Sequence, residues 1–165
     1  MNMDTLVQKA PETQTQLPHV LVEYLDGTKL NDRVGEAICV TTVDSAGWPH
    51  TSLLSVGEIL AIDAGHVRLA TWKHSGTAAN IAKTGRVSLV LARDHVLWEV
   101  FATATRLTDT DDDQGLALFS ASVVKVRAHR VDYAEVLTGV TYRLLDRADI
   151  VKRWTSQIAT LRAVK

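Results

Sequence analysis

The residues from Lys73 to Thr77 combine side chains that bind anions with the predicted start of a helix. Lys73 supplies a positive charge, Ser75 and Thr77 supply hydroxyl groups, and Gly76 lies between those two. The first N–H groups of a helix have no partner within it and lie at the positive end of its dipole. This combination is typical of a phosphate site, but the same residue types also serve only as helix caps and solvated charges. One glycine makes neither a GxGxxG fingerprint nor a P-loop.

The surrounding residues predict a strand, a turn, a short helix and a second strand. Val67 to Thr71 is an apolar, β-branched run of strand length. We expect Ser75 to cap the helix that follows, Gly85 to end it, and Arg86 to Leu91 to form the next strand. The candidate phosphate site therefore lies where a strand turns into a helix.

Length and composition favour a single soluble domain. The chain has 165 residues, of which 46% are hydrophobic and 22% are charged, and its formal net charge is −1. Such a balance gives no general attraction to nucleic acid or to an anionic membrane, and we expect neither partner. Cys39 is the only cysteine, which fits a reducing compartment. No apolar run approaches the ~18 residues that span a bilayer, and the N-terminus lacks the layout of a signal peptide. We expect a cytoplasmic protein.

Hairpins and flanking helices are predicted for the rest of the chain. Residues 1–16 are polar and are expected to form a loose N-terminal arm. Gly57 predicts a bulge or bend inside its strand. Three helices are predicted here. The first is His19–Leu25, and the last is Arg147–Leu161, with Trp154 in the core. The middle helix starts at Thr108 or Asp109 and has Leu116, Phe119 and Val123 on one side. The other predicted strands are Glu36–Val43, His50–Ile62, Leu97–Leu107 and one within Tyr133–Leu145.

Short turns between many strands, with few helices, predict a mainly β protein. A doubly wound parallel sheet would need a helix between most pairs of strands. The pattern instead favours an antiparallel barrel with peripheral helices.

Three segments in this order and spacing carry a family resemblance: CVTTVDSAGWPHTSLLSV, VRLATWKHSGTAANIAKTGRVSLVL and WEVFATATRL. They resemble the pyridoxamine 5′-phosphate oxidase-like superfamily, the FMN-binding split β-barrel. The match includes the first hairpin and its turn, the strand–helix–strand unit with S-x-T-x-x-N, and a following strand of small residues. The resemblance covers roughly Glu36 to Leu107. It implies one FMN-binding domain over residues 1–165, with an antiparallel split barrel of six or so strands and flanking helices.

The same resemblance assigns an FMN site at the interface of a homodimer. It places the phosphate on Lys73, Ser75 and Thr77. Trp98 is expected to line the cleft from the other subunit. The isoalloxazine would lie along two strands, beside His50, Thr51, Ser52, Leu69, Ala70, Thr71 and Trp72.

The expected activity is that of an oxidoreductase acting on an unidentified small molecule, with a nicotinamide donor as one candidate partner. The flavin itself would supply the redox chemistry, so no catalytic side chain is predicted. Many relatives have two adjacent basic residues where this chain has Lys73-His74. No counterpart was found for the basic residues that hold the substrate phosphate in the biosynthetic oxidase, which argues against oxidation of pyridoxamine phosphate.

Two alternatives stay open. One is a non-catalytic protein that carries a flavin, a deazaflavin or haem, with His50 or His74 as a candidate haem ligand. The other is a cofactor-free interaction protein that uses the basic run Lys125–Arg130. The histidines show no spacing typical of a metal site, and none is predicted. Glu58 and Glu99 are expected on exposed strand faces.

Overall fold

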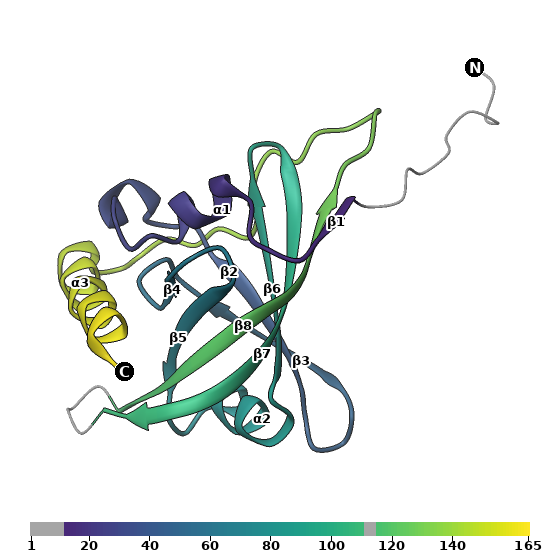
Figure 1. Cartoon of the computed structure of the whole chain (residues 1–165). Coiled ribbons are helices and arrows are strands. Elements are labelled where there is room, and N and C mark those ends of the chain that lie inside the picture. The colour runs from purple at the N-terminus through teal and green to yellow at the C-terminus, as the bar shows by residue number, and fades with distance from the viewer. Residues whose placement is uncertain (1–11, 111–114) are drawn as a thin grey trace.

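The computed structural model describes residues 12–110 and 115–165. Figure 1 shows a curled sheet with helices at its ends and side. In chain order the elements are β1 (Glu12–Gln14), α1 (His19–Tyr24), η2 (Leu30–Arg33), β2 (Ile38–Val43), β3 (Pro49–Leu54), β4 (Ile59–Ala61), β5 (His66–Trp72), α2 (Gly76–Thr84), β6 (Arg86–Arg93), β7 (Val96–Asp109), β8 (Leu116–His129) and α3 (Arg147–Ala163).

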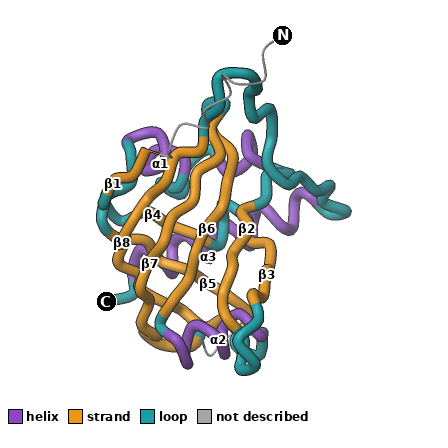
Figure 2. Tube along the Cα trace, turned by 90° about the vertical axis from the view of Figure 1, so that its right-hand side faces the viewer, coloured by secondary structure: helices purple, strands orange, loops and turns teal. Residues whose placement is uncertain are grey.

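The strands form one antiparallel sheet that curls into a half-barrel. Their order is β3-β2-β6-β7-β8-β5-β4, and β1 pairs with β8 off this path. The two longest strands, β7 and β8, lie side by side at its centre (Figure 2). The first half of β8 pairs with β5, and a short stretch near its end pairs with β1. The predicted split β-barrel is confirmed, and the described sheet has eight strands where six or so were expected.

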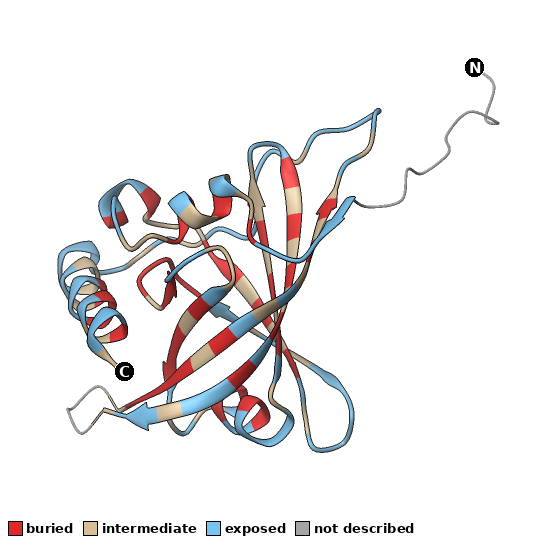
Figure 3. Ribbon diagram, viewed as in Figure 1, coloured by how far each residue is buried: buried red, intermediate tan, exposed pale blue. Residues whose placement is uncertain are grey.

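The core fills the inside of the curled sheet. Successive side chains of a strand point to opposite faces, so buried and lighter bands alternate along the strands in Figure 3. In β2, Ile38 and Val40 are fully buried, whereas Cys39 and Thr41 are partly exposed. Phe119 of β8 is fully buried, in the same core.

Two helices matter for the site. α2 covers one end of the half-barrel and packs against β2, β3 and β7 (Figure 1). α3 packs beside β4 and β5 and buries Trp154, which confirms both the predicted C-terminal helix and its core tryptophan.

The predicted helix from Thr108 or Asp109 to Val123 is wrong, because Leu116–His129 forms strand β8. Phe119 pairs with Leu69 of β5 and Arg106 of β7, so this segment lies between two strands. Ladder hydrogen bonds on both sides outweigh the helical spacing of its apolar residues. The acidic first turn predicted at Asp111–Asp113 lies outside the described residues.

The strand predicted within Tyr133–Leu145 is also wrong. This segment forms no named strand: its ladder contact is an isolated bridge between Glu36 and Thr141, just before β2, with hydrogen bonds to Gly35 and Ala37 on either side. It cannot join the sheet beside β2, because β2 already pairs with β3 and β6.

Smaller differences concern a bend and the arm. The predicted strand His50–Ile62 is divided into β3 and β4 by a turn that contains Gly57. Residues 12–14 of the predicted arm form β1, and residues 1–11 lie outside the described part of the chain.

Candidate functional site

The N-terminus of α2 has the geometry that the sequence predicts. Ser75 is in an extended conformation, and its Oγ accepts a hydrogen bond of 3.1 Å from the N–H of Ala78. Gly85 ends the helix in a left-handed conformation. The predicted cap and helix end are therefore confirmed, and the positive end of the helix dipole lies at Ser75.

Lys73 leads from the end of β5 into this helix. Its N–H donates a hydrogen bond of 2.9 Å to the carbonyl oxygen of Gly115. The lysine stem also lies against Gly115, where an added Cβ would come within 3.4 Å of Lys73 Cε. These contacts fix how the lysine leaves the strand, two residues before the helix cap.

The residues Thr77 and Asn80 attach α2 to the sheet. Thr77 is buried, and its Oγ1 donates a hydrogen bond of 2.9 Å to Ser52 Oγ on β3. Asn80 Nδ2 donates a hydrogen bond of 3.0 Å to Thr42 Oγ1 on β2. The serine of the S-x-T-x-x-N pattern is thus a cap, and its threonine and asparagine are tethers. In this arrangement Thr77 offers an anion its backbone N–H, because its hydroxyl hydrogen is directed to Ser52.

Two buried polar atoms beside this helix have no hydrogen-bond partner in the described residues. They are Nδ1 of His50 on β3 and Oγ1 of Thr71 on β5. Thr71 is 2% exposed. The His50 ring lies close to Gly76, where an added Cβ would be 3.2 Å from His50 Nε2. Buried polar atoms without a partner are rare, so each of these two is a candidate contact for a bound ligand.

The other predicted strand residues differ in exposure. Leu69 and Ala70 are fully buried, whereas Trp72 at the end of β5 is 49% exposed. Thr51 is exposed, and its Oγ1 lies 3.2 Å from Thr41 Oγ1 on β2. Exposure thus varies along these strands, but the strands themselves meet: β3, the end of β5 and the start of α2 lie together at one end of the half-barrel (Figure 1).

Trp98 is not part of this group within one chain. It is 5% exposed, and its Nε1–H donates a hydrogen bond of 3.1 Å to the carbonyl oxygen of Arg93 near the β6–β7 turn. The part of β7 near α2 is instead Thr103, which pairs with Arg86 just after the helix ends. Trp98 lies five residues earlier on β7, away from α2. The assignment of Trp98 to the cleft of a second subunit stays a prediction.

A cluster that sequence reasoning missed lies between β3 and α3. Glu58, expected on an exposed face, is instead partly buried, and its Oε2 accepts hydrogen bonds from Ser55 N–H at 2.7 Å and from Ser55 Oγ at 2.8 Å. Burial raises the pKa of Glu58, whereas the Ser55 bonds and the nearby Arg153 act to lower it. The Ser-x-x-Glu spacing, typical of a capping box, could have revealed the pair. Arg153 and Tyr142, which join the cluster from distant parts of the chain, had no local signal.

The basic run Lys125–Arg130 lies mainly on β8 and is largely engaged within the sheet. Arg127 and His129 each lie 3.4 Å from Oε2 of Glu99, which is partly buried rather than on the exposed face expected of it. The Lys125 ammonium lies 4.5 Å from the centre of the Phe101 ring. These contacts account for much of the positive charge of the run.

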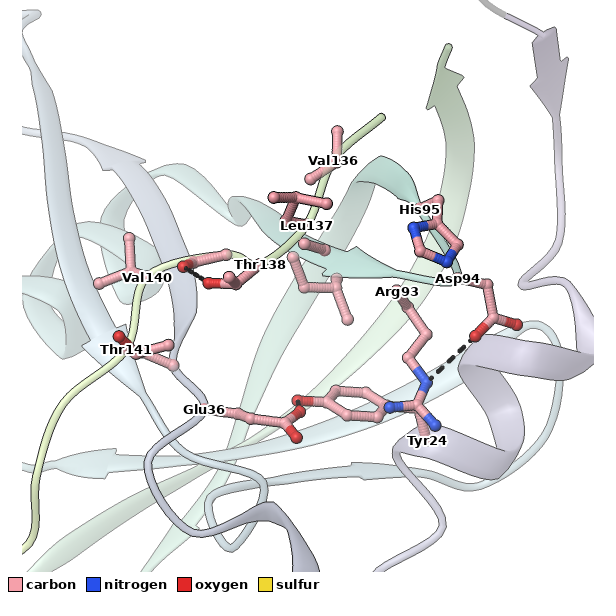
Figure 4. Close-up of a pocket in the computed structure, with 14 residues that line it drawn as sticks. Tyr24, Glu36, Arg93, Asp94, His95, Val136, Leu137, Thr138, Val140 and Thr141 are labelled. Atoms are coloured by element: carbon pink, nitrogen blue, oxygen red, sulfur yellow. Dashed lines mark hydrogen bonds and ion pairs between the residues drawn. The ribbon is translucent and has the colours of Figure 1, made fainter. Parts of the chain in front are cut away.

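A separate cavity lies near the β6–β7 turn (Figure 4). The Tyr24 hydroxyl donates a hydrogen bond of 2.7 Å to Glu36 Oε2, and the Arg93 guanidinium lies over the Tyr24 ring. Burial and Glu36 raise the pKa of Tyr24. Asp94 lies 3.7 Å from Arg93 Nε, so the main polar groups of this cavity are paired with one another.

Comparison with known proteins gives the family. The family model described as pyridoxamine 5′-phosphate oxidase matches residues 35–141, which run from just before β2 through β8 and into the following loop. The chain belongs to this family. The match includes the start of α2 and the strands beside it, and α3 follows the matched range.

Two relatives of this family member illustrate the likeness. The uncharacterized protein YclD of Bacillus subtilis (strain 168) is 32% identical over 143 residues, covering 86% of this chain and 93% of its own. The crystal structure of a candidate pyridoxamine 5′-phosphate oxidase from Lactobacillus delbrueckii has a TM-score of 0.55 at 20% identity. It covers 70% of this chain and 97% of its own. At that identity the structural likeness shows the fold alone.

Residues 12–110 and 115–165 contain no helix that is long and apolar enough to cross a membrane. The same residues contain no group of three or more His, Cys, Asp or Glu side chains placed to hold a metal ion.

Proposed function

We propose that this chain binds FMN at the end of the half-barrel formed by β3, the end of β5 and the start of α2. The observation that carries the proposal is the pair of buried atoms without a partner, His50 Nδ1 and Thr71 Oγ1, on the two strands beside the helix start. A polar ring edge that bonds to both would satisfy them, and FMN also carries the phosphate that a helix start binds. The residues present therefore fit the group.

The phosphate end of the site has three distinct contributions. Lys73 supplies charge from the strand side. Ser75 already accepts a bond from Ala78, so its own hydroxyl hydrogen is available to a phosphate oxygen. Thr77 contributes its backbone N–H, because its hydroxyl is bonded to Ser52.

The ring end would lie along β3 and β5. Backbone groups of Thr51, Ser52, Leu69 and Ala70 would meet the polar edge of the flavin, and Trp72 would offer an exposed aromatic side chain. Bound FMN would supply the redox chemistry, while the chain binds and orients it. On this basis the protein is an oxidoreductase that acts on a small molecule, with a nicotinamide donor as a candidate partner.

A homodimer, with Trp98 lining the cleft from the second subunit, would complete the site. Four large apolar side chains are exposed in the single chain: Val43, Trp48 and Leu53 on the β2–β3 hairpin, and Trp72 at the end of β5. A second subunit packed on these strands would cover them. The single cysteine, Cys39, is consistent with the reducing cytoplasm as its location.

The double variant Lys73→Ala/Ser75→Ala tests the phosphate assignment. We expect it to weaken FMN binding by at least about tenfold, roughly 1.4 kcal/mol, and to leave riboflavin binding unchanged, since riboflavin has no phosphate. Lys83→Ala, which removes a charge at the other end of α2, is the matched control and should bind FMN as the unaltered protein does. Equal FMN affinity of the double variant and the control would refute the assignment.

Turnover separates an enzyme from a carrier. If the FMN-loaded protein reduces its flavin with NADH or NADPH and passes the electrons on repeatedly, it is an oxidoreductase. A protein that binds FMN but shows no flavin reduction by either donor or by other small reductants would be a non-catalytic flavin carrier.

A further inference from the structure

A cavity of about 260 Å³ lies between β3, the turn that follows it and α3. An apolar cavity of about 150 Å³ holds a benzene molecule, so this one has room for a substituted ring. Its polar groups are those of Ser55, Glu58, Tyr142 and Arg153. Its apolar walls are Leu53, Leu54, Leu144, Ile150 and Trp154.

Glu58 leaves one carboxylate oxygen free for a ligand. Both hydrogen bonds from Ser55 end on Oε2, and Oε1 has no partner in the described residues. The backbone of Glu58 is fixed as well, because its carbonyl oxygen accepts a hydrogen bond of 2.9 Å from the N–H of Ala70. The carboxyl group is therefore held in place with an unused acceptor.

Arg153 lines the same cavity without pairing with Glu58. Its Nε is buried and has no hydrogen-bond partner, and the guanidinium forms no ion pair with another described residue. Its guanidinium carbon, Cζ, instead lies 5.7 Å from the centre of the Trp72 ring. A buried donor without a partner is costly, so a ligand that accepts from Arg153 would gain from the existing arrangement.

Tyr142 contributes a hydroxyl group next to Ser55. Burial and the nearby Glu58 raise the pKa of Tyr142 to about 12, so it stays protonated and can donate a hydrogen bond at neutral pH. The cavity thus offers one acceptor from Glu58 and donors from Arg153 and Tyr142, between apolar walls.

The cavity is continuous with the candidate cofactor strands. The backbone carbonyl of Glu58 accepts a hydrogen bond from the N–H of Ala70, and the Arg153 guanidinium lies over the Trp72 ring, so both residues are anchored to β5. A ligand in the cavity would lie beside the end of this strand.

We propose that this cavity binds a planar ring that carries a primary carboxamide. The amide N–H₂ would donate to Glu58 Oε1, its oxygen would accept from Arg153 or Tyr142, and the ring would pack against the apolar walls. A carboxylate would be attracted by Arg153 but repelled by Glu58, and an ammonium would be attracted by Glu58 but repelled by Arg153. A neutral carboxamide meets neither repulsion, because it donates to one side chain and accepts from the other. The nicotinamide ring of a pyridine nucleotide has this chemistry. Its assignment as the electron donor rests on the proposed flavin function, whereas carboxamide binding itself does not.

Three probes of matched shape test the proposal on the full chain as purified: benzamide, benzoate and benzylamine. Binding is measured by calorimetry and by tryptophan fluorescence, to which Trp154 in the cavity wall and Trp72 beside Arg153 contribute. We expect benzamide to bind at least about tenfold more tightly than either charged probe. Absence of benzamide binding, or benzoate binding as tightly as benzamide, would overturn the proposal.

Single substitutions should change the preference in opposite directions. Glu58→Gln removes the anion, so the affinity for benzoate should rise relative to that for benzamide. Arg153→Gln removes the cation, so the affinity for benzylamine should rise relative to that for benzamide. Lys152→Gln, on the same helix but exposed, is the matched control and should leave all three affinities unchanged. If neither cavity variant alters the order of the probes, the two charges do not select the ligand and the proposal fails.

Two further titrations separate this proposal from the flavin proposal. FMN binding by Glu58→Gln and Arg153→Gln should stay within about twofold of the unaltered protein, since the phosphate contacts lie on α2. Benzamide binding without FMN binding would refute the proposed function alone, and FMN binding without benzamide binding would refute the cavity alone. NADH should displace benzamide, and failure to do so would overturn the electron-donor assignment and leave a free carboxamide as the ligand.

Discussion

At the residue scale, the candidate site is defined by buried polar atoms that have no hydrogen-bond partner among residues 12–110 and 115–165. A buried donor or acceptor without a hydrogen bond costs about 1–3 kcal/mol, because it has lost its water and gained nothing in return. Thr71 Oγ1 is in this situation: it lies on β5, the strand expected to contact the flavin, where Thr71 pairs with Ala117 of β8. The cost is tolerable only if something else, such as a bound ligand, uses the atom.

Replacing this hydroxyl by a methyl group should therefore separate stability from binding. We expect Thr71→Val to raise the free energy of unfolding of the FMN-free protein by up to about 1–3 kcal/mol and to weaken FMN binding. Urea unfolding and FMN titration measure the two effects. Thr105→Val, at an exposed position of β7, is the control and should change stability by less than about 0.5 kcal/mol. Lower stability of Thr71→Val would show that its hydroxyl has a partner in solution.

Glu58 gives a pH-dependent prediction. Because burial raises its pKa in the folded protein, the folded state holds the proton more tightly than the unfolded state. Stability is therefore lost as pH rises from the ordinary carboxyl pKa of about 4.3 to the higher folded value, by about 1.4 kcal/mol per unit of difference. Glu58→Gln cannot ionise, so its stability relative to the unaltered protein should increase as the pH rises above about 4 and Glu58 loses its proton.

Unfolding of the two proteins by urea across this pH range measures the difference. Any constant effect of the amide on the Ser55 bonds cancels in the comparison. Glu23→Gln, at an exposed position of α1, is the control and should show no such change. A stability difference between Glu58→Gln and the unaltered protein that is independent of pH would contradict the assignment.

At the element scale, the sequence predicts helix ends, which depend on neighbouring residues, better than strand pairing, which depends on residues far apart in the chain. The start and end of α2 follow from Ser75 and Gly85, whose roles depend only on neighbouring residues. β8 could not be predicted in the same way, because its pairing with β5 and β7 involves residues far away in the sequence.

Gly57 was expected as a bulge or bend, and it does lie in the turn between β3 and β4. The reason for the glycine is the approach of Trp154 from α3.

Gly57→Ala should loosen the packing of α3 on this turn. An added Cβ would lie 2.1 Å from Trp154 Cγ, so the buried indole would have to move. We expect a loss of at least about 1–3 kcal/mol in the free energy of unfolding. Gly65→Ala is the matched control, because the nearest atom to its added Cβ is 3.5 Å away. Equal stability of the two variants would mean that α3 does not pack here as described.

At the scale of the whole molecule, the phosphate site could be predicted from the sequence, whereas the cavity could not. Lys73, Ser75 and Thr77 are consecutive enough that their chemistry is visible in the sequence. The cavity beside them draws Glu58, Tyr142 and Arg153 from across the chain, and only the fold brings them together. The antiparallel β architecture predicted from turns and strand runs is confirmed, and the sheet is open as the family resemblance implies. Short antiparallel connections limit the topologies available.

Titration of the cofactor-free protein with FMN and with riboflavin tests the central claim most directly. Quenching of flavin fluorescence gives both affinities under the same conditions. We expect saturable binding, with FMN preferred by at least about tenfold because only FMN places a phosphate at the start of α2. Equal affinity for the two flavins would contradict the phosphate site, and no binding of either would contradict the flavin function itself.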